Sequence, residues 1–106
     1  MKLVHQFDMK PGTIQGEYGS VDTYDIERDG IVAGIRTIRP NSSVPRRPHS
    51  HPERQIIYLI SGFASITNGR EEFTLKPGDF VLLEPDEEHY VITTEHEAVV
   101  FEVKYP

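Results

Sequence analysis

The stretch PHSHPERQIIYLISG, residues 48–62, holds the most informative pattern in this chain. It places His49 and His51 two positions apart, just ahead of Gln55 and an apolar segment. Side chains alternate along an extended backbone, so residues at i and i+2 point to the same side. Neutral imidazole is the commonest metal ligand in proteins, and a more distant His89 could approach the pair. We therefore predict that His49, His51, Gln55 and His89 together hold one divalent metal ion.

The remainder of the chain is divided by Gly, Pro and Asn at short intervals, with β-branched and aromatic runs between them. Such runs are typical of strands, and no window shows a helical period of apolar residues. Eight short strands with frequent turns indicate an all-β sandwich, jelly roll or barrel. The predicted strands are 20–27, 31–38, 55–61, 64–67, 72–75, 79–83, 89–93 and 98–104.

Three turns connect these strands through residues that tolerate a positive φ. Asp29-Gly30 and Asn68-Gly69 each suit a two-residue hairpin turn of type I′, which needs a positive φ at both positions. The segment Lys76–Asp79 has proline second and glycine third, as a type II turn requires. The sequence therefore predicts hairpins at 29–30 and 68–69 and a tight turn at 76–79.

Length and composition limit the class of protein. The 106 residues are expected to form a single domain, residues 1–106, and the chain has no cysteine, so thiolate metal sites and disulfides are excluded. A net charge of −6 disfavours nucleic acid and anionic membranes as partners. The first residues lack an apolar signal segment, and no later run approaches the length of a membrane span. We expect a cytoplasmic protein.

The segment after Gln55 is apolar on both faces, whereas a strand with one wet face would alternate. The runs 81–83 and 99–101 share this property. One face would line the domain interior, and the other would meet a second layer. We predict a homodimer formed by sheet packing; the alternative is that the chain's own N-terminal strand covers this face.

Two segments resemble the sequence motifs of the cupin family. Residues 48–55 followed by Gly62 are similar to the first cupin motif, and Pro77-Gly78-Asp79 through Pro85 to His89 is similar to the second. This resemblance implies a double-stranded β-helix, the cupin jelly-roll barrel, with a metal ion in its mouth. The usual glutamate ligand of the first motif falls at Gln55, whose neutral oxygen would leave the charge of the ion uncompensated. Mn, Fe, Ni and Zn all suit such ligands.

The first motif also resembles that of small cupins that open unsaturated uronate sugars. The shared residues are His49, His51, Pro52, Gln55, Tyr58, Gly62 and His89. This resemblance implies a metal-dependent enzyme of carbohydrate metabolism that moves a proton on a carboxylated sugar or a similar small anionic metabolite. Two alternatives stay open: a three-histidine metal dioxygenase, and a cupin that binds or senses a small ligand without catalysis.

Arginines gather near the predicted metal site, although the chain as a whole is acidic. Arg47 comes just before His49, and Arg36 lies on a strand that leads toward it. A guanidinium group can clamp a carboxylate through two hydrogen bonds. We therefore predict that Arg36 and Arg47 bind an anionic substrate. Tyr58 is a candidate proton donor, but it is an odd number of residues from Gln55 and faces the opposite side of the strand, so we expect it to pack in the core or at an interface.

Overall fold

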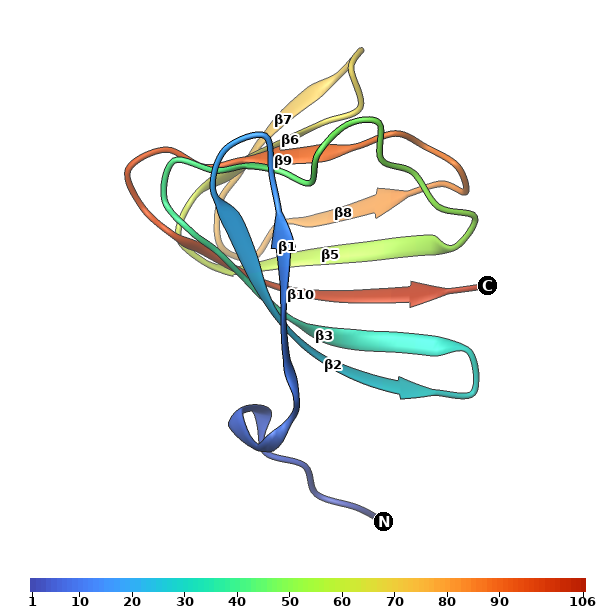
Figure 1. Cartoon of the computed structure of the whole chain (residues 1–106). Coiled ribbons are helices and arrows are strands. Elements are labelled where there is room, and N and C mark those ends of the chain that lie inside the picture. Colours follow the sequence, from blue (N-terminus) through green and yellow to red (C-terminus); the bar gives the residue numbers. More distant parts are fainter.

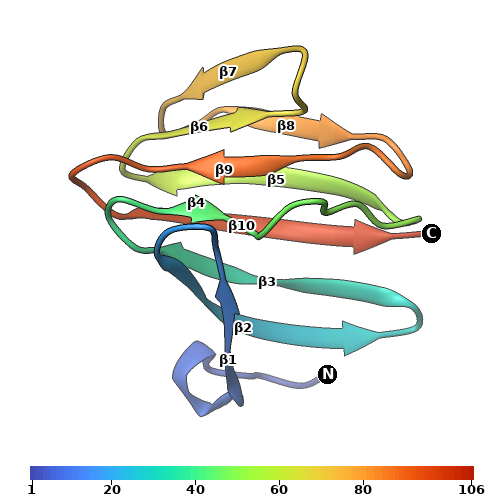
Figure 2. The ribbon, with the colours of Figure 1, turned by 45° about the horizontal axis from the view of Figure 1, so that its top comes forward.

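The computed structural model describes all 106 residues as two antiparallel sheets, which face each other (Figure 1). The larger sheet has the strand order β1-β2-β3-β10-β5-β8, and the smaller one has the order β4-β9-β6-β7. In Figure 2 the smaller sheet lies over the larger one, with β9 above β5 and β4 above β10. The elements are η1 (Gln6–Asp8), β1 (Pro11–Gln15), β2 (Ser20–Arg28), β3 (Ile31–Ile38), β4 (Ser43–Val44), β5 (Arg54–Ser61), β6 (Ala64–Thr67), β7 (Glu72–Leu75), β8 (Phe80–Leu83), β9 (Tyr90–Ile92) and β10 (Ala98–Tyr105).

The predicted all-β jelly roll is confirmed, and each of the eight predicted strands is present with bounds that shift by one residue at most. Strands β1 and β4 were not predicted. Strand β1 begins with Pro11 and Gly12, which are poor strand formers, and it forms only by pairing with β2 at the edge of the larger sheet. Strand β4 has two residues, too few for a sequence pattern.

Two of the three predicted turns are confirmed. Asp29 and Gly30 have φ values of 53° and 80°, as a type I′ turn requires, and Gly78 has a φ of 99° at the third place of the turn 76–79. The type I′ turn at Asn68-Gly69 is wrong, because only Gly69 has a positive φ. The Asn68 side chain instead accepts hydrogen bonds from the N–H groups of residues 70 and 71, and this moves the centre of the turn one residue along.

The apolar core lies between the two sheets and is built from inward-facing positions of the strands. Strand β5 illustrates the alternation, because Gln55, Ile57 and Leu59 are buried while Arg54 and Ile60 are exposed. Gly62 ends this strand with a φ of 84°, and a Cβ there would lie 2.1 Å from a backbone oxygen. The buried apolar residues are Val21, Ile38, Val44, Ile57, Leu59, Ala64, Ile66, Leu75, Val81, Leu83, Ala98 and Val100.

The opposite face of β5, β8 and β10 is uncovered in the single chain. Phe80 and Leu82 are 64% and 67% exposed, and Tyr58 packs on Phe80 with ring centroids 4.6 Å apart. Strand β1 cannot cover this face, because it lies at the far edge of the sheet from β8. The alternative in which the chain's own N-terminal strand covers the face is therefore wrong. The only helix is the single turn η1, and none is long enough to cross a membrane.

Candidate metal centre

Two loops at the same end of the barrel bring the three histidines together. His49 and His51 lie in the segment between β4 and β5, and His89 immediately precedes β9. This segment has no strand pairing, so His49 and His51 are held by loop backbone and not by a sheet. Backbone hydrogen bonds join the two loops instead: the His89 N–H donates to the His49 carbonyl (3.2 Å), and the Asp86 N–H donates to the His51 carbonyl (2.8 Å).

The three imidazole rings converge on one point. Each offers a ring nitrogen, and these nitrogens all lie within 4.8 Å of one another. The ring centroids are 4.9 to 5.5 Å apart, and the rings are nearly perpendicular. Two nitrogens bound to one zinc ion at about 2.1 Å are separated by up to about 4.2 Å. Three nitrogens around one ion cannot all lie opposite one another, and at tetrahedral angles they are about 3.4 Å apart. Movements of about an ångström would therefore bring the cluster to metal-binding geometry, and His49, His51 and His89 suggest a metal site.

Backbone carbonyls fix the protonation of two of the rings. His51 Nδ1 lies 3.1 Å from the Glu53 carbonyl oxygen, and His89 Nδ1 lies 2.9 Å from the Glu87 carbonyl oxygen. A carbonyl only accepts, so each Nδ1 carries a proton, and in the neutral ring each Nε2 presents a lone pair toward the cluster. Metal-binding histidines are typically oriented in this way by a partner on the far nitrogen.

Gln55 is the fourth member of the site, and its orientation is set by a carboxylate. Its Nε2 donates to Glu102 on β10, so its Oε1 must face the opposite way, 2.8 Å from His51 Nε2. With a neutral His51, both atoms of this contact carry a lone pair and no hydrogen. A cation shared between them would turn two repelling acceptors into two ligands. The donor set thus fits a divalent ion.

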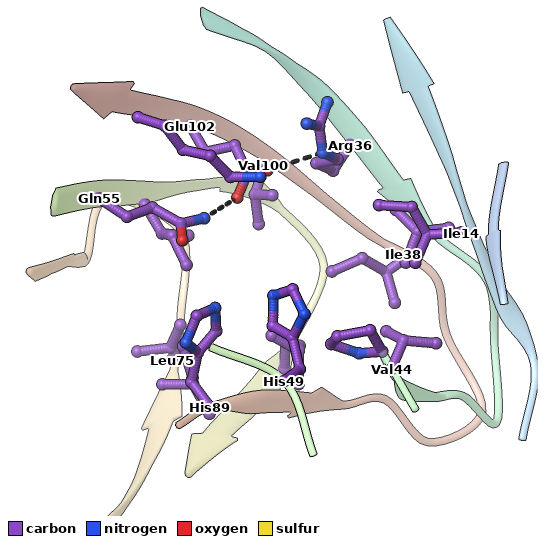
Figure 3. Close-up of a pocket in the computed structure, with 17 residues that line it drawn as sticks. Ile14, Arg36, Ile38, Val44, His49, Gln55, Leu75, His89, Val100 and Glu102 are labelled. Carbon is purple, nitrogen blue, oxygen red and sulfur yellow. Dashed lines mark hydrogen bonds and ion pairs between the residues drawn. The ribbon is translucent and has the colours of Figure 1, made fainter. Parts of the chain in front are cut away.

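A chain of buried charges continues from Gln55 across the larger sheet (Figure 3). Arg36 Nε forms an ion pair with Glu102 at 2.7 Å, and the two terminal nitrogens of Arg36 donate to Asp25 at 2.6 and 3.2 Å. Glu102 and Arg36 are only 8% and 5% exposed. The negative charge of Glu102 is therefore separated from the proposed ion by the Gln55 side chain alone. The expectation that the charge of the ion is uncompensated is corrected by this nearby carboxylate.

Burial favours the neutral, metal-binding form of His49 and His89 by lowering their pKa values. It is the main cause that lowers the pKa of His49 to about 4, with the neighbouring charges of His89, His51 and Lys104 acting in the same direction. Burial likewise lowers the pKa of His89. Protons therefore compete weakly with a metal ion at these two residues near neutral pH.

His49 and His89 line a cavity of about 80 Å³ between the sheets. In Figure 3 Gln55, Glu102 and Arg36 lie along one wall, and His49 and His89 face them from the other. The remaining wall is almost entirely aliphatic. It is formed by Ile14, Val21, Ile38, Val44, Ile57, Ala64, Ile66, Leu75, Val91 and Val100, and Pro45 and Lys104 complete the lining.

The two predicted substrate-binding arginines occupy different places. Arg36 lines the cavity, but its guanidinium is already paired with Asp25 and Glu102. Arg47 does not line the cavity; its guanidinium lies 3.4 Å from the ring centroid of Tyr90 and donates to Ser43. Their substrate roles stay predictions, and neither arginine presents a free charge to the cavity.

Glu102 and Lys104 are lining residues that the sequence reasoning missed. Within 98–104, every second residue from Ala98 faces inward, and Glu102 and Lys104 fall in that phase. A charged residue in phase with buried apolar positions is a signal that could have identified both.

Comparison with known proteins agrees with this architecture. The sequence model of the family described as "Cupin domain" matches residues 34–103. A predicted oxalate decarboxylase from Thermotoga maritima superposes with a TM-score of 0.83 at 19% identity, covering 98% of both chains. KdgF from Halomonas sp. gives 0.80 at 16% identity, covering 99% of this chain and 94% of its own. The polyketide cyclase RemF from Streptomyces resistomycificus gives 0.78 at 22% identity, covering 98% and 78%. No curated protein matches the sequence.

Proposed function

This chain belongs to the cupin family, and on that premise we propose that it is a metal-dependent enzyme acting on a small anionic metabolite. His49, His51, His89 and Gln55 would hold the ion. The observation that supports this most directly is the contact between His51 Nε2 and Gln55 Oε1, two lone pairs at 2.8 Å beside two further imidazoles. Two acceptors that face each other are stabilised by a cation between them, which either a metal ion or a proton on His51 Nε2 supplies.

The residues around such a site have different roles. The ion would supply Lewis acidity toward a substrate oxygen, and four protein ligands leave a coordination position for it. Glu53 and Glu87 orient two of the imidazoles through their carbonyl groups. Glu102 has both carboxylate oxygens occupied, by Gln55 and by Arg36, and so holds Gln55 in place rather than moving a proton.

The finer proposal is proton transfer of the isomerase or lyase type on a carboxylated sugar or a similar anionic compound. The resemblance of residues 49–62 and His89 to the uronate-opening cupins supports it. The name of one similar structure, a predicted oxalate decarboxylase, also points to a carboxylate as the substrate of that protein. The cluster of three histidines equally suits a dioxygenase, which the test below separates by oxygen uptake.

Metal analysis of the purified protein tests the proposal. After loading with Mn²⁺, Fe²⁺, Ni²⁺ or Zn²⁺ and dialysis, we expect about one ion per chain by ICP-MS and near-complete loss in His51→Ala and His89→Ala. His96→Ala is the matched control, because His96 is exposed and outside the cluster, and it should retain the ion. Stoichiometric metal in both cluster variants would refute the site. Oxygen uptake by the iron-loaded protein with a carboxylate or a diketone would replace the isomerase or lyase proposal with the dioxygenase.

A further inference from the structure

Lys104 occupies a place in the cavity that the proposed metal chemistry does not use. It lies on the inward face of β10, two residues beyond Glu102, and it pairs in register with Gln55 on β5. Its side chain is half-buried and lines the same cavity as His49 and His89. Its charge also contributes to the lowered pKa of both histidines, which agrees with its position beside them.

The charges that line the cavity leave Lys104 without a partner. Arg36 and Glu102 neutralise each other, and Asp25 takes the other side of Arg36. Lys104 has no carboxylate oxygen within 4.0 Å. An ammonium group that is partly removed from water and not paired gains free energy by binding an anion. Lys104 is thus the one lining cation that is available to a ligand.

The size and polarity of the cavity walls indicate what the uncharged part of the ligand is. Ten of the 17 lining residues are hydrophobic, and they form the inner wall beyond the polar side chains. A cavity of about 150 Å³ with similar walls holds the six carbons of benzene. The volume of about 80 Å³ found here therefore suits an aliphatic body of about three carbons. The hydroxyl groups of a sugar would find few hydrogen-bond partners on such walls.

We infer that Lys104 binds the negative charge of the substrate, and that the cavity takes a short-chain aliphatic monocarboxylate whose body packs against the aliphatic wall. This inference rests on the proposed metal site and small anionic substrate, because the carboxylate end would lie between Lys104 and the metal centre. Within that proposal it selects an aliphatic carboxylate in place of the carboxylated sugar. A single free cation matches a monoanion better than a phosphate dianion, which needs several donors.

Cobalt-loaded protein allows the inference to be tested with two probes that differ in charge and hardly in shape. The probes are 2-oxopentanoate and its neutral amide, 2-oxopentanamide, and binding is followed by the visible absorption of Co²⁺ and by calorimetry. We expect the wild-type protein to prefer the carboxylate. Lys104→Met should weaken binding of the carboxylate by about tenfold, because it removes one charge-assisted hydrogen bond, and it should leave binding of the amide unchanged. Lys104→Arg should retain most of the affinity.

Lys76→Met is the matched control, since Lys76 is exposed on the turn between β7 and β8 and does not line the cavity. It should bind both probes like the wild type. Equal carboxylate affinity in Lys104→Met and wild type, with cobalt bound in both, would overturn the role of Lys104 without affecting the proposed metal site. Tighter binding of D-galacturonate than of 2-oxopentanoate would overturn the aliphatic ligand and favour the sugar. Failure of the wild type to take up cobalt would overturn the proposed function, and the inference with it.

Discussion

The position of Glu102 explains why residue 55 is a glutamine. The amide of Gln55 has a donor end and an acceptor end, and it needs both: Nε2 meets the Glu102 carboxylate while Oε1 faces His51. A glutamate at this position would place two carboxylates in contact inside the barrel, where like charges are costly. The cupin motif usually supplies a carboxylate at position 55. In this chain the carboxylate belongs to Glu102 on β10, which contacts Gln55 and not the proposed ion.

Glu102→Gln tests this positioning role. The new amide can present either end to Gln55, so the orientation of Gln55 Oε1 is no longer enforced. We expect metal affinity to fall by about tenfold to a hundredfold, the range typical of residues that orient metal ligands. A competition titration with a chelator measures the change, and circular dichroism checks that the sheets remain folded.

The exposed Glu97, in the loop before β10, offers the control Glu97→Gln, which should leave metal affinity unchanged. Wild-type affinity in Glu102→Gln would show that Gln55 is oriented by something other than the carboxylate.

At the scale of strands, the ion pairs of the buried Arg36 with Glu102 and Asp25 depend on the pairing of β2, β3 and β10. Asp25 on β2 and Glu102 on β10 are both register partners of Gly34 on β3, and Arg36 is two residues further along that strand. Gly34 leaves open the space through which the Asp25 side chain reaches Arg36. An added Cβ would lie 2.2 Å from Asp25 Oδ1 and 2.3 Å from the Tyr24 carbonyl oxygen.

Gly34→Ala should therefore destabilise the protein by about 1–3 kcal/mol, the usual cost of forcing an extra methyl group into a packed site. Denaturant unfolding of the metal-free protein measures this, so that metal binding does not enter the comparison. Ala33→Gly is a useful contrast, because Ala33 faces the other side of β3 and the change there removes a methyl group without touching Asp25. A Gly34→Ala protein as stable as the wild type would contradict this argument, because β2 and β3 would then have to accommodate the methyl group with no loss of stability.

At the scale of the whole molecule, an exposed apolar patch on the outer face of the larger sheet indicates an interaction site. This outer patch consists of Tyr58, Ile60, Phe80, Leu82 and Phe101, most of them well exposed. Contiguous apolar surface of this kind marks interaction sites on single domains. We propose that a second copy of the chain covers it, as the apolar character of both faces of β5 led us to expect.

Light scattering after size exclusion should then give about twice the chain mass of 12.1 kDa at micromolar concentration. The double variant Phe80→Lys/Leu82→Lys should run as a monomer, because two charges cannot be buried at the centre of the patch. Tyr18→Lys, at an exposed position in the loop between β1 and β2, is the control and should remain a dimer. A wild-type protein that runs at the mass of one chain would refute the homodimer.

The sequence by itself determined the strands and the group of candidate ligands. The apolar, β-branched run 55–61, the type I′ pair Asp29-Gly30 and the spacing of His49, His51 and His89 are local patterns, and local backbone preferences are sufficient to give them physical meaning. Strands β1 and β4 lacked such a pattern, since each exists only through a neighbour on the sheet.

Only the tertiary structure decided which charges meet. Asp25, Arg36, Gln55 and Glu102 come from four strands, and the contacts among them follow from strand order and register. The same packing paired Arg36 and left Lys104 free, although a count of arginines near the histidines favoured the opposite assignment. The physical reason is that the electrostatic environment of a buried side chain is set by the partners across the sheet, and sequence separation carries almost no information about them.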